Sequence, residues 1–506
     1  MTEVVAGGEE LRLSQAERLA TDLPAEWLEE HAVLPVRVED GRLVVATWRD
    51  GVDVQALDEL RLRWGPHLRL VRAPEAEVRA TVRRLYAGDE LTAENVIAGL
   101  SAGASSGEPE RALDDLVHQA NEAPVVRLVN LLLLEALEAR ASDVHIEGYA
   151  RGLRVRYRVD GVLQDVPSPP AGLMPAVLSR LKIMADLDIA ERRVPQDGRI
   201  RLRLHDRQVD VRVSTLPTLG GESVVLRLLD KERGGRVGLG ELGMGADTLD
   251  AFVRAISRPH GIVLATGPTG SGKTTTLYAG LDRVRTGREK ILTVEDPVEY
   301  ELEGVPQVQV NEKVGVTFAT ALRALLRQDP DVMLVGEIRD EETAEIATHA
   351  ALTGHLVLST LHTNDAPGAL TRLLDLGIPP YLVASTVEAV LAQRLVRVVC
   401  GDCARREPAE PGLLADFGAA GPPLHHVVRG AGGERCRGTG YRGRMGIYEL
   451  LVMEDDLRAR MLQHRDAGEL RRAAIDKGMR TLRQDGLRLV REGVTTPEEV
   501  LRVTRG

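Results

Sequence analysis

The chain has 506 residues, 43% of them hydrophobic and 28% charged, and its net charge at pH 7 is −11. This length exceeds what one hydrophobic core supports, so several globular domains are expected. The acidic balance argues against a protein whose main task is to bind nucleic acid, and three cysteines are too few for a disulfide framework. No basic leader with an apolar core opens the chain, and no apolar run reaches the roughly 18–20 residues of a membrane span. We therefore expect a cytoplasmic protein that reaches a membrane only through a partner.

Residues 1–90 predict a small α+β domain without a catalytic constellation, which favours a docking or regulatory module. Its expected helices are Leu11–Leu23, Ala25–His31, Val54–Trp64 and Ala76–Tyr86, and its expected strands are Val36–Val38 and Leu43–Thr47. Residues 91–114 are rich in Gly, Ala and Ser and predict a flexible linker.

Residues 115–236 predict a second α+β domain that is rich in arginine. Its expected helices are Pro124–Ala139 and Leu173–Leu187, and its expected strands are Ile200–Leu204, Val209–Val213 and Ser223–Leu229, with a hairpin turn at the end of the alternating segment Leu153–Gly161. Taken alone, arginines that alternate along strands indicate a solvated sheet face.

Residues 237–506 predict an α/β domain. Its strand candidates are Ile262–Ala265, Ile291–Val294, Val332–Val335 and Leu356–Ser359, with helical patterns between them, which is typical of a parallel sheet covered on both faces. Residues 398–444 are an irregular insertion that contains the cysteines. Residues 447–506 predict mostly helices, and Thr496 caps the last of them in a capping box with Pro497 at its first position.

The stretch Gly267-Pro-Thr-Gly-Ser-Gly-Lys-Thr274 fits the phosphate-loop pattern G-x-x-x-x-G-K-[ST] and lies between a predicted strand and a predicted helix. Glycines let backbone N–H groups turn inward around an anion, and the helix N-terminus adds partial positive charge. Lys273 can reach the outer phosphates of a nucleotide, and Thr274 can place a hydroxyl on Mg²⁺. The candidate nucleotide-binding residues are Gly267, Pro268, Thr269, Gly270, Ser271, Gly272, Lys273, Thr274 and Thr275.

Acids follow two of the predicted strands and belong at the same sheet edge as the phosphate loop. Glu337 ends the apolar strand Val332–Val335, where a carboxylate can polarise the attacking water and help to order Mg²⁺. Glu295 and Glu299 follow Ile291–Val294 and are candidates for metal and water positioning. His355 and His362 flank the strand Leu356–Ser359 and are candidates for contact with a phosphate.

Phosphoryl transfer spreads negative charge that an arginine from another domain or subunit often stabilises. Arg212 and Arg227 lie on strands just before the connection to the nucleotide domain and are the candidates for this role. Their placement weakens the solvated-face interpretation of the arginines.

Together these motifs resemble the secretion ATPase superfamily, and most closely the assembly ATPases of bacterial type II secretion. Gly267–Thr274 resembles the family's Walker A loop, Glu295–Glu299 its Asp box, Gly336-Glu337 its Walker B acid, and His355 and His362 its His box. The segments Ser142–Glu147, Val155–Gly161 and Arg192–Gly198 resemble landmarks of the family's second N-terminal domain. The segments around Arg212 and Arg227 resemble its Arg-finger strands.

The resemblance implies a RecA-like ATPase domain that binds ATP and Mg²⁺. It also implies a homo-hexamer peripherally associated with the inner membrane. The family powers pseudopilus assembly for protein secretion, and its first domain binds an inner-membrane platform protein.

The sequence leaves four alternatives, of which the pilus retraction ATPases are disfavoured by the first domain and the cysteine insertion of this chain. The related type IV pilus assembly ATPases fit nearly as well. A conjugation-type ATPase that moves DNA is disfavoured by the charge of −11. A docking protein that binds nucleotide without turnover is disfavoured by Glu337.

One departure concerns zinc. The family commonly carries two C-x₂-C pairs, whereas here Cys400 and Cys403 form one pair and Cys436 stands alone, with Gly433 at the expected fourth position. A structural zinc site usually has four protein ligands, so either His425 or His426 supplies the missing one or the metal is lost.

Overall fold

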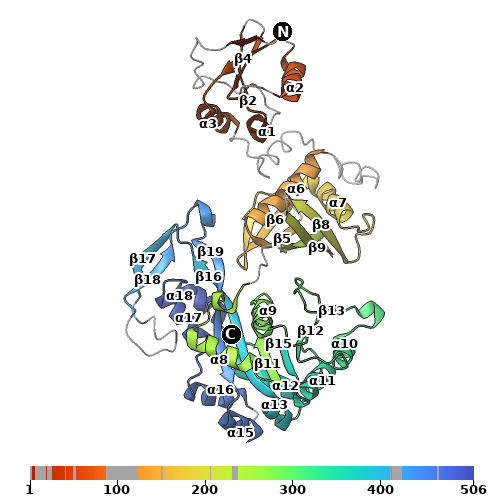
Figure 1. Ribbon diagram of the computed structural model, residues 1–506, viewed down its shortest axis with the longest axis vertical. Coiled ribbons are helices and arrows are strands. Elements are labelled where there is room, and N and C mark those ends of the chain that lie inside the picture. Colours follow the sequence, from red (N-terminus) through yellow and green to blue (C-terminus); the bar gives the residue numbers. More distant parts are fainter. Residues whose placement is uncertain are drawn as a thin grey trace.

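The computed structural model describes residues 3–5, 19, 25–39, 42–49, 53–65, 67–86, 123–149, 152–204, 207–230, 237–410, 412, 417, 424–463 and 466–505. Within these residues the chain builds three larger sheets one after another along the sequence (Figure 1). Except for Leu19, the helix predicted over 11–23 lies outside the described residues, as does the linker predicted over 91–114.

The first sheet has four strands in the order β1-β4-β3-β2. Its strands are β1 Glu3–Val5, β2 Val33–Glu39, β3 Arg42–Thr47 and β4 Leu68–Arg72, and the helices are α1 Ala25–Glu30, α2 Val54–Trp64 and α3 Glu75–Tyr86. The predicted strands are confirmed as β2 and β3, whose Leu34 and Val45 side chains are fully buried. The edge strand β1 and its neighbour β4 were not predicted, because three and five residues give too little alternation to recognise.

The second sheet is antiparallel in all its described pairs, with the order β7-β6-β5-β10-β9-β8. Its strands are β5 Ala141–Tyr149, β6 Gly152–Val159, β7 Val162–Val166, β8 Gln196–Leu204, β9 Arg207–Thr218 and β10 Gly221–Asp230, and its helices are α6 Ala123–Glu138 and α7 Met174–Met184. Helix α6 is held to the sheet because the Tyr157 hydroxyl donates to the Leu132 carbonyl at 2.8 Å. The hairpin predicted at residues 160–161 is confirmed between β6 and β7.

Side chains alternate across this second sheet, and the arginines lie on the face away from the core. Val211 and Val213 of β9 are buried under the helices, so Arg212 between them points to the other face. Cross-strand register then aligns charged residues in one row, namely Arg158, Asp143, Arg227, Arg212 and Arg199 on β6, β5, β10, β9 and β8.

The third sheet has seven strands in the order β13-β12-β14-β15-β11-β16-β19. They are β11 Gly261–Thr266, β12 Ile291–Glu295, β13 Gln307–Gln309, β14 Val332–Val335, β15 Leu356–Leu361, β16 Val387–Val399 and β19 Tyr441–Val452, and all neighbours are parallel except β16 with β19. Its helices are α8 Ala246–Ile256, α9 Lys273–Val284, α10 Phe318–Leu325, α11 Glu341–Leu352, α12 Ala366–Asp375 and α13 Pro380–Thr386. Alternate residues of β11 enter two separate hydrophobic clusters, so both faces are covered as predicted.

Two long strands of the third sheet were missed, and part of the predicted helical region is wrong. β16 follows α13 without a Gly or Pro between them, and its apolar run suits either a buried helix or a buried strand. Residues 447–452, predicted as helix, belong to β19 and pair with β16. The pairing buries Ile447 and Leu451, which explains the apolar content that a helix would also require.

The remaining strands and α-helices of the described residues are a two-stranded ribbon and four helices. They are β17 Ala404–Pro408, β18 His426–Gly430, α15 Asp455–Gln463, α16 Ala467–Asp476, α17 Leu482–Arg491 and α18 Pro497–Thr504. Thr496 caps α18 by accepting from the Glu499 N–H, as predicted, whereas the Glu499 carboxylate binds Arg397 and Arg502 instead of closing a capping box. Among the described helices, none combines the length and apolar character that crossing a membrane requires.

Candidate active site

The phosphate loop connects β11 to α9 at the carboxyl edge of the third sheet. Gly267 has φ of 150°, and a Cβ there would lie 2.5 Å from the Gln393 carbonyl oxygen. Gly272 has φ of 88°, and its Cβ would lie 2.8 Å from Gln393 Nε2. Gln393 of β16 also accepts a hydrogen bond from the Thr276 hydroxyl at 2.8 Å. Glycine is therefore required where the loop passes close to the neighbouring strand.

Lys273, the first residue of α9, folds back along this loop. Its Nζ donates to the Gly267 carbonyl at 2.8 Å and to the Pro268 carbonyl at 3.2 Å. Burial lowers the pKa of Lys273 to about 8, and the nearby Arg394 lowers it further while Glu337 opposes the shift. The Lys273 amine is thus poorly solvated, so an anion bound beside it would stabilise its charged form.

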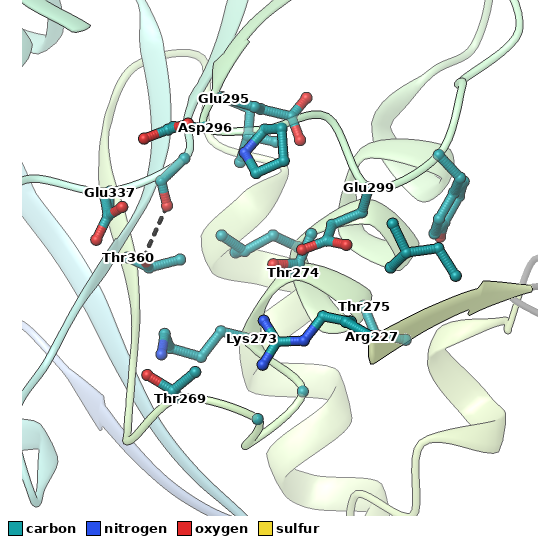
Figure 2. A pocket seen from close by; sticks show the side chains of 18 of the residues that line it. Arg227, Thr269, Lys273, Thr274, Thr275, Glu295, Asp296, Glu299, Glu337 and Thr360 are labelled. Carbon is teal, nitrogen blue, oxygen red and sulfur yellow. Dashed lines mark hydrogen bonds between the residues drawn. The ribbon is translucent and has the colours of Figure 1, made fainter. Parts of the chain in front are cut away.

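A cavity of about 670 Å³ opens above the loop, between the third sheet and the arginine face of the second (Figure 2). The predicted residues that line it are Arg212, Arg227, Thr269, Gly270, Gly272, Lys273, Thr274, Thr275, Glu295, Glu299, Glu337 and His362. Gly267, Pro268 and Ser271 shape the loop but do not line this cavity. The volume matches that of ordinary small-molecule and cofactor sites.

Glu337 lies two residues beyond the end of β14, where the sequence predicts it. One carboxylate oxygen is 2.5 Å from the Arg339 guanidinium, and the other is 3.4 Å from His362 Nε2. The side chain is largely buried, with 14% exposed. The Thr360 hydroxyl donates to the Gly336 carbonyl at 2.7 Å, which fixes the backbone next to Glu337. The carboxylate is therefore held in one orientation at the cavity wall.

The acidic stretch after β12 splits into a buried and an exposed part. Glu295 is 3% exposed and accepts from Thr293 at 2.6 Å, from Gln307 at 3.1 Å and from the Tyr278 hydroxyl. Burial, with Glu295 adding to it, raises the pKa of Tyr278, so this phenol stays a hydrogen-bond donor. Glu299, in contrast, is exposed and lies near Thr274 and Arg227 in Figure 2. Glu295 thus anchors the stretch, and Glu299 faces the cavity.

Arg212 and Arg227 reach the cavity from adjacent strands of the second sheet. Arg227 Nε donates to Asp143 at 2.9 Å, so its charge is balanced within its own sheet. Burial lowers the pKa of Arg212, whereas Glu299 and Asp296, in the segment after β12, raise it. Both arginines lie at the cavity of their own chain.

The two histidines do not lie together, and the placement expected for His355 is wrong. Because a parallel strand has its two ends at opposite sheet edges, the residue before β15 and the residue after it lie roughly 23 Å apart. His355 Nδ1 contacts the Ala350 carbonyl at 2.9 Å, far from the cavity lining, whereas His362 lines the cavity beside Glu337.

Several lining residues were missed, among them Asp296, Tyr300, Arg339 and Arg444. Arg339 could have been found, since it follows Glu337 by two residues at the same sheet edge. Arg444 could not, because β19 brings it in after the irregular insertion. Its guanidinium lies 3.7 Å from Asp160 of the second sheet, whose carboxylate also accepts from the Gly443 N–H at 2.8 Å.

The three cysteines converge at the base of the β16–β19 pair. Their sulfur atoms all lie within 4.8 Å of one another, as expected for candidate metal ligands. His425 and His426 do not join them. His426 pairs with Pro408 at one end of the β17–β18 ribbon, and Cys403 precedes the other end, where Ala404 pairs with Gly430. Four strand residues, about 13 Å, separate the two ends, so of the two alternatives the one in which a histidine completes the site is wrong.

Together these features define a P-loop ATPase, because a phosphate loop and a fixed carboxylate share the carboxyl edge of a mostly parallel sheet. Residues 118–502 match the family model described as Type II/IV secretion system protein, and residues 9–91 match that of the MshEN domain. The chain belongs to the Type II/IV secretion system protein family.

Three known proteins illustrate the likeness. The chain is 56% identical over 394 residues to Type II secretion system protein E of Pectobacterium carotovorum subsp. carotovorum, which is 78% of either chain. It is 46% identical over 488 residues to the Type IV pilus assembly ATPase PilB of Myxococcus xanthus, which is 95% of this chain and 85% of that one. The crystal structure of the pilus retraction motor PilT with bound ADP is similar with a TM-score of 0.50 and 25% identity, covering 74% of this chain and 96% of that one.

Proposed function

We propose that the protein hydrolyses ATP to drive pseudopilus assembly in a type II secretion system. The observation that supports this proposal most is the cavity. In it, Lys273 and Glu337 at the carboxyl edge of the third sheet face Arg212 and Arg227 of the second sheet. The family match and the relative named Type II secretion system protein E support secretion as the process that the hydrolysis drives.

In this proposal the phosphate loop and Lys273 bind the nucleotide phosphates. Thr274 provides a hydroxyl and Glu299 a carboxylate on the same cavity wall, and such oxygen atoms are the ligands that Mg²⁺ prefers. Glu337 would hold the ion through water. The ion, when bound, would neutralise charge on the outer phosphates. The residues present therefore fit both ATP and Mg²⁺.

Glu337 is the proposed general base that polarises the attacking water. Arg339 and His362 each contact one of its oxygens, which holds the carboxylate in place without removing it from the cavity. Glu295 has a supporting role, because its three hydrogen bonds fix the stretch that carries Glu299.

Arg212 and Arg227 are the proposed source of positive charge in the transition state. Arg212 is the stronger candidate, since it is partly buried, whereas Asp143 already balances Arg227. A guanidinium in such a position stabilises charge that develops on the transferred phosphoryl group.

We propose that the protein works as a homo-hexamer on the cytoplasmic side of the inner membrane. The first domain, which matches the MshEN model, then docks to a membrane platform protein. A role in type IV pilus assembly is the alternative, which the extensive match to PilB supports. Complementation separates the two: the chain should restore secretion to a strain that lacks its type II secretion ATPase, and should not restore pili to one that lacks its pilus assembly ATPase.

The direct test of the enzyme is Glu337→Gln, which keeps the side-chain shape and removes its basicity. We expect nucleotide binding within about two-fold of the wild type and hydrolysis slower by about 10²–10⁴-fold. Glu342→Gln is the matched control, because Glu342 is an exposed acid at the start of α11 that pairs with Arg323. Unchanged hydrolysis by the Glu337→Gln protein would remove the base assignment.

A further inference from the structure

The three thiols are spaced like corners of a metal site. Cys403 Sγ and Cys436 Sγ lie 3.7 Å apart, and Cys400 Sγ is within 4.8 Å of both. Zn–S bonds of about 2.3 Å place the sulfur atoms of a tetrahedral site about 3.8 Å apart. A disulfide instead requires about 2.0 Å. The separation therefore fits an edge of a zinc tetrahedron.

The surrounding backbone supports thiolate ligands. Cys436 Sγ accepts hydrogen bonds from the Gly433 N–H at 3.1 Å and from the Gly440 N–H at 3.3 Å. Such donors orient ligating sulfur atoms and stabilise their negative charge. The donor set and its support thus fit Zn²⁺, except that it has three protein ligands.

The missing fourth corner lies at Gly433. Its backbone is extended, with φ of −151°, so any residue could stand there without strain. A Cβ at this position would lie 3.6 Å from Cys403 Cβ, and a side chain at 433 would therefore point into the cluster.

Within the described part of the chain, no imidazole or carboxylate joins the three thiols as a fourth ligand. Asp402 is an acid close to the cluster, with its carboxylate 3.8 Å from Cys400 Sγ. It also forms an ion pair with Arg435 at 3.2 Å and is half exposed, so it is turned toward the arginine.

We propose that Cys400, Cys403 and Cys436 bind one Zn²⁺ and leave its fourth coordination position, beside Gly433, open to solvent. A structural zinc site is normally closed by four protein ligands, which makes the ion slow to leave. An open position lets a competing ligand attack the ion directly. The zinc of this chain is accordingly exchangeable, and this property is independent of the proposed ATPase activity.

The test compares the full-length wild type with Gly433→Cys, which restores the fourth thiol. Gly401→Cys is the matched control, because a Cβ at Gly401 in the same segment meets nothing within 4 Å. Cobalt replaces zinc, and the thiolate-to-cobalt charge-transfer absorption per bound ion reports the number of thiolates. We expect the absorption per bound ion of the wild type to be about three quarters of that of Gly433→Cys. The absorption of Gly401→Cys should equal that of the wild type.

Zinc release to a chelator gives a second measurement that needs no enzymatic activity. Loss of a residue that only supports a metal ligand lowers metal affinity by about 10-fold or more. Because the wild type lacks a whole ligand, we expect it to release zinc at least about 10-fold faster than Gly433→Cys.

Three results would overturn the inference. They are a wild type that binds neither metal, equal absorption and release in the wild type and Gly433→Cys, and loss of the ion in Asp402→Asn, which would make the carboxylate the fourth ligand.

Discussion

The two sheets that face the cavity contribute different groups for a structural reason. The third sheet presents its carboxyl edge to the cavity. The loops that follow its parallel strands bring backbone N–H groups, Lys273 and Glu337 to this edge. The second sheet presents the middle of antiparallel strands, where alternate side chains such as Arg212 share one face. The groups of the third sheet therefore depend on loop conformation at one sheet edge, whereas the positive charge of the second sheet depends on strand register.

The largest effect is expected from a substitution that removes the positive charge contributed by the second sheet. We expect Arg212→Ala to lower kcat by about 10³-fold with little change in nucleotide affinity, because an arginine finger acts on the transition state. Steady-state hydrolysis and nucleotide titration measure the two quantities. Arg154→Ala is the control, since Arg154 lies in the same sheet and pairs with Asp165 away from the cavity.

Mixing subunits sharpens this prediction. Arg212 faces the cavity of its own chain, so a mixture of Arg212→Ala and Lys273→Ala subunits should recover no activity. Recovery of hydrolysis in the mixture would show that the arginine acts on a neighbouring subunit. It would contradict the inference that both sheets of one chain serve the same cavity.

A smaller effect tests the third sheet through pH. Burial lowers the pKa of Lys273 to about 8, so the amine is charged below that pH and loses its proton above it. Because the charged form binds phosphate, we expect the affinity for ADP to fall by up to about 10-fold per pH unit above 8. Titrations between pH 7.5 and about 9.5 check this, and Lys273→Arg should show weaker binding without the slope. An equal slope in both proteins would assign the titration elsewhere.

The smallest expected effect concerns the contact between the two sheets. Asp160 has a left-handed backbone with φ of 49° and accepts from the Gly443 N–H beside Arg444. Asp160→Gly keeps the turn but loses the hydrogen bond, worth about 1 kcal/mol, so kcat should fall about five-fold. Asp186→Gly is the control, since Asp186 also has a positive φ, of 57°, and follows α7, where its carboxylate forms no ion pair with the described residues of the third sheet. An equal loss in both variants would indicate a general effect on the fold.

Most of the cavity edge of the third sheet could be predicted from the sequence, because its groups are local to strand ends. The phosphate loop, Glu337 and His362 all follow apolar runs that mark strands. His355 was grouped with His362 although a parallel strand separates its two ends. Arg444 and Gln393 could not be predicted, because both depend on the pairing of β16 with β19, and neither strand can be told from a buried helix by its pattern.

The missing zinc ligand shows a different limit. The sequence identifies the departure at Gly433 but not its consequence. Only the register of the β17–β18 ribbon shows that His425 and His426 lie at the wrong end to compensate.

Strand β16 also has a mechanical consequence. Gln393 touches the phosphate loop, and Cys400 follows directly after the strand ends, roughly 23 Å further along. A hydrogen-bonded strand transmits displacement along its length with little stretching. One continuous strand therefore joins the cysteine cluster to the phosphate loop, so a rigid displacement of either end would shift Gln393 against Gly267 and Gly272.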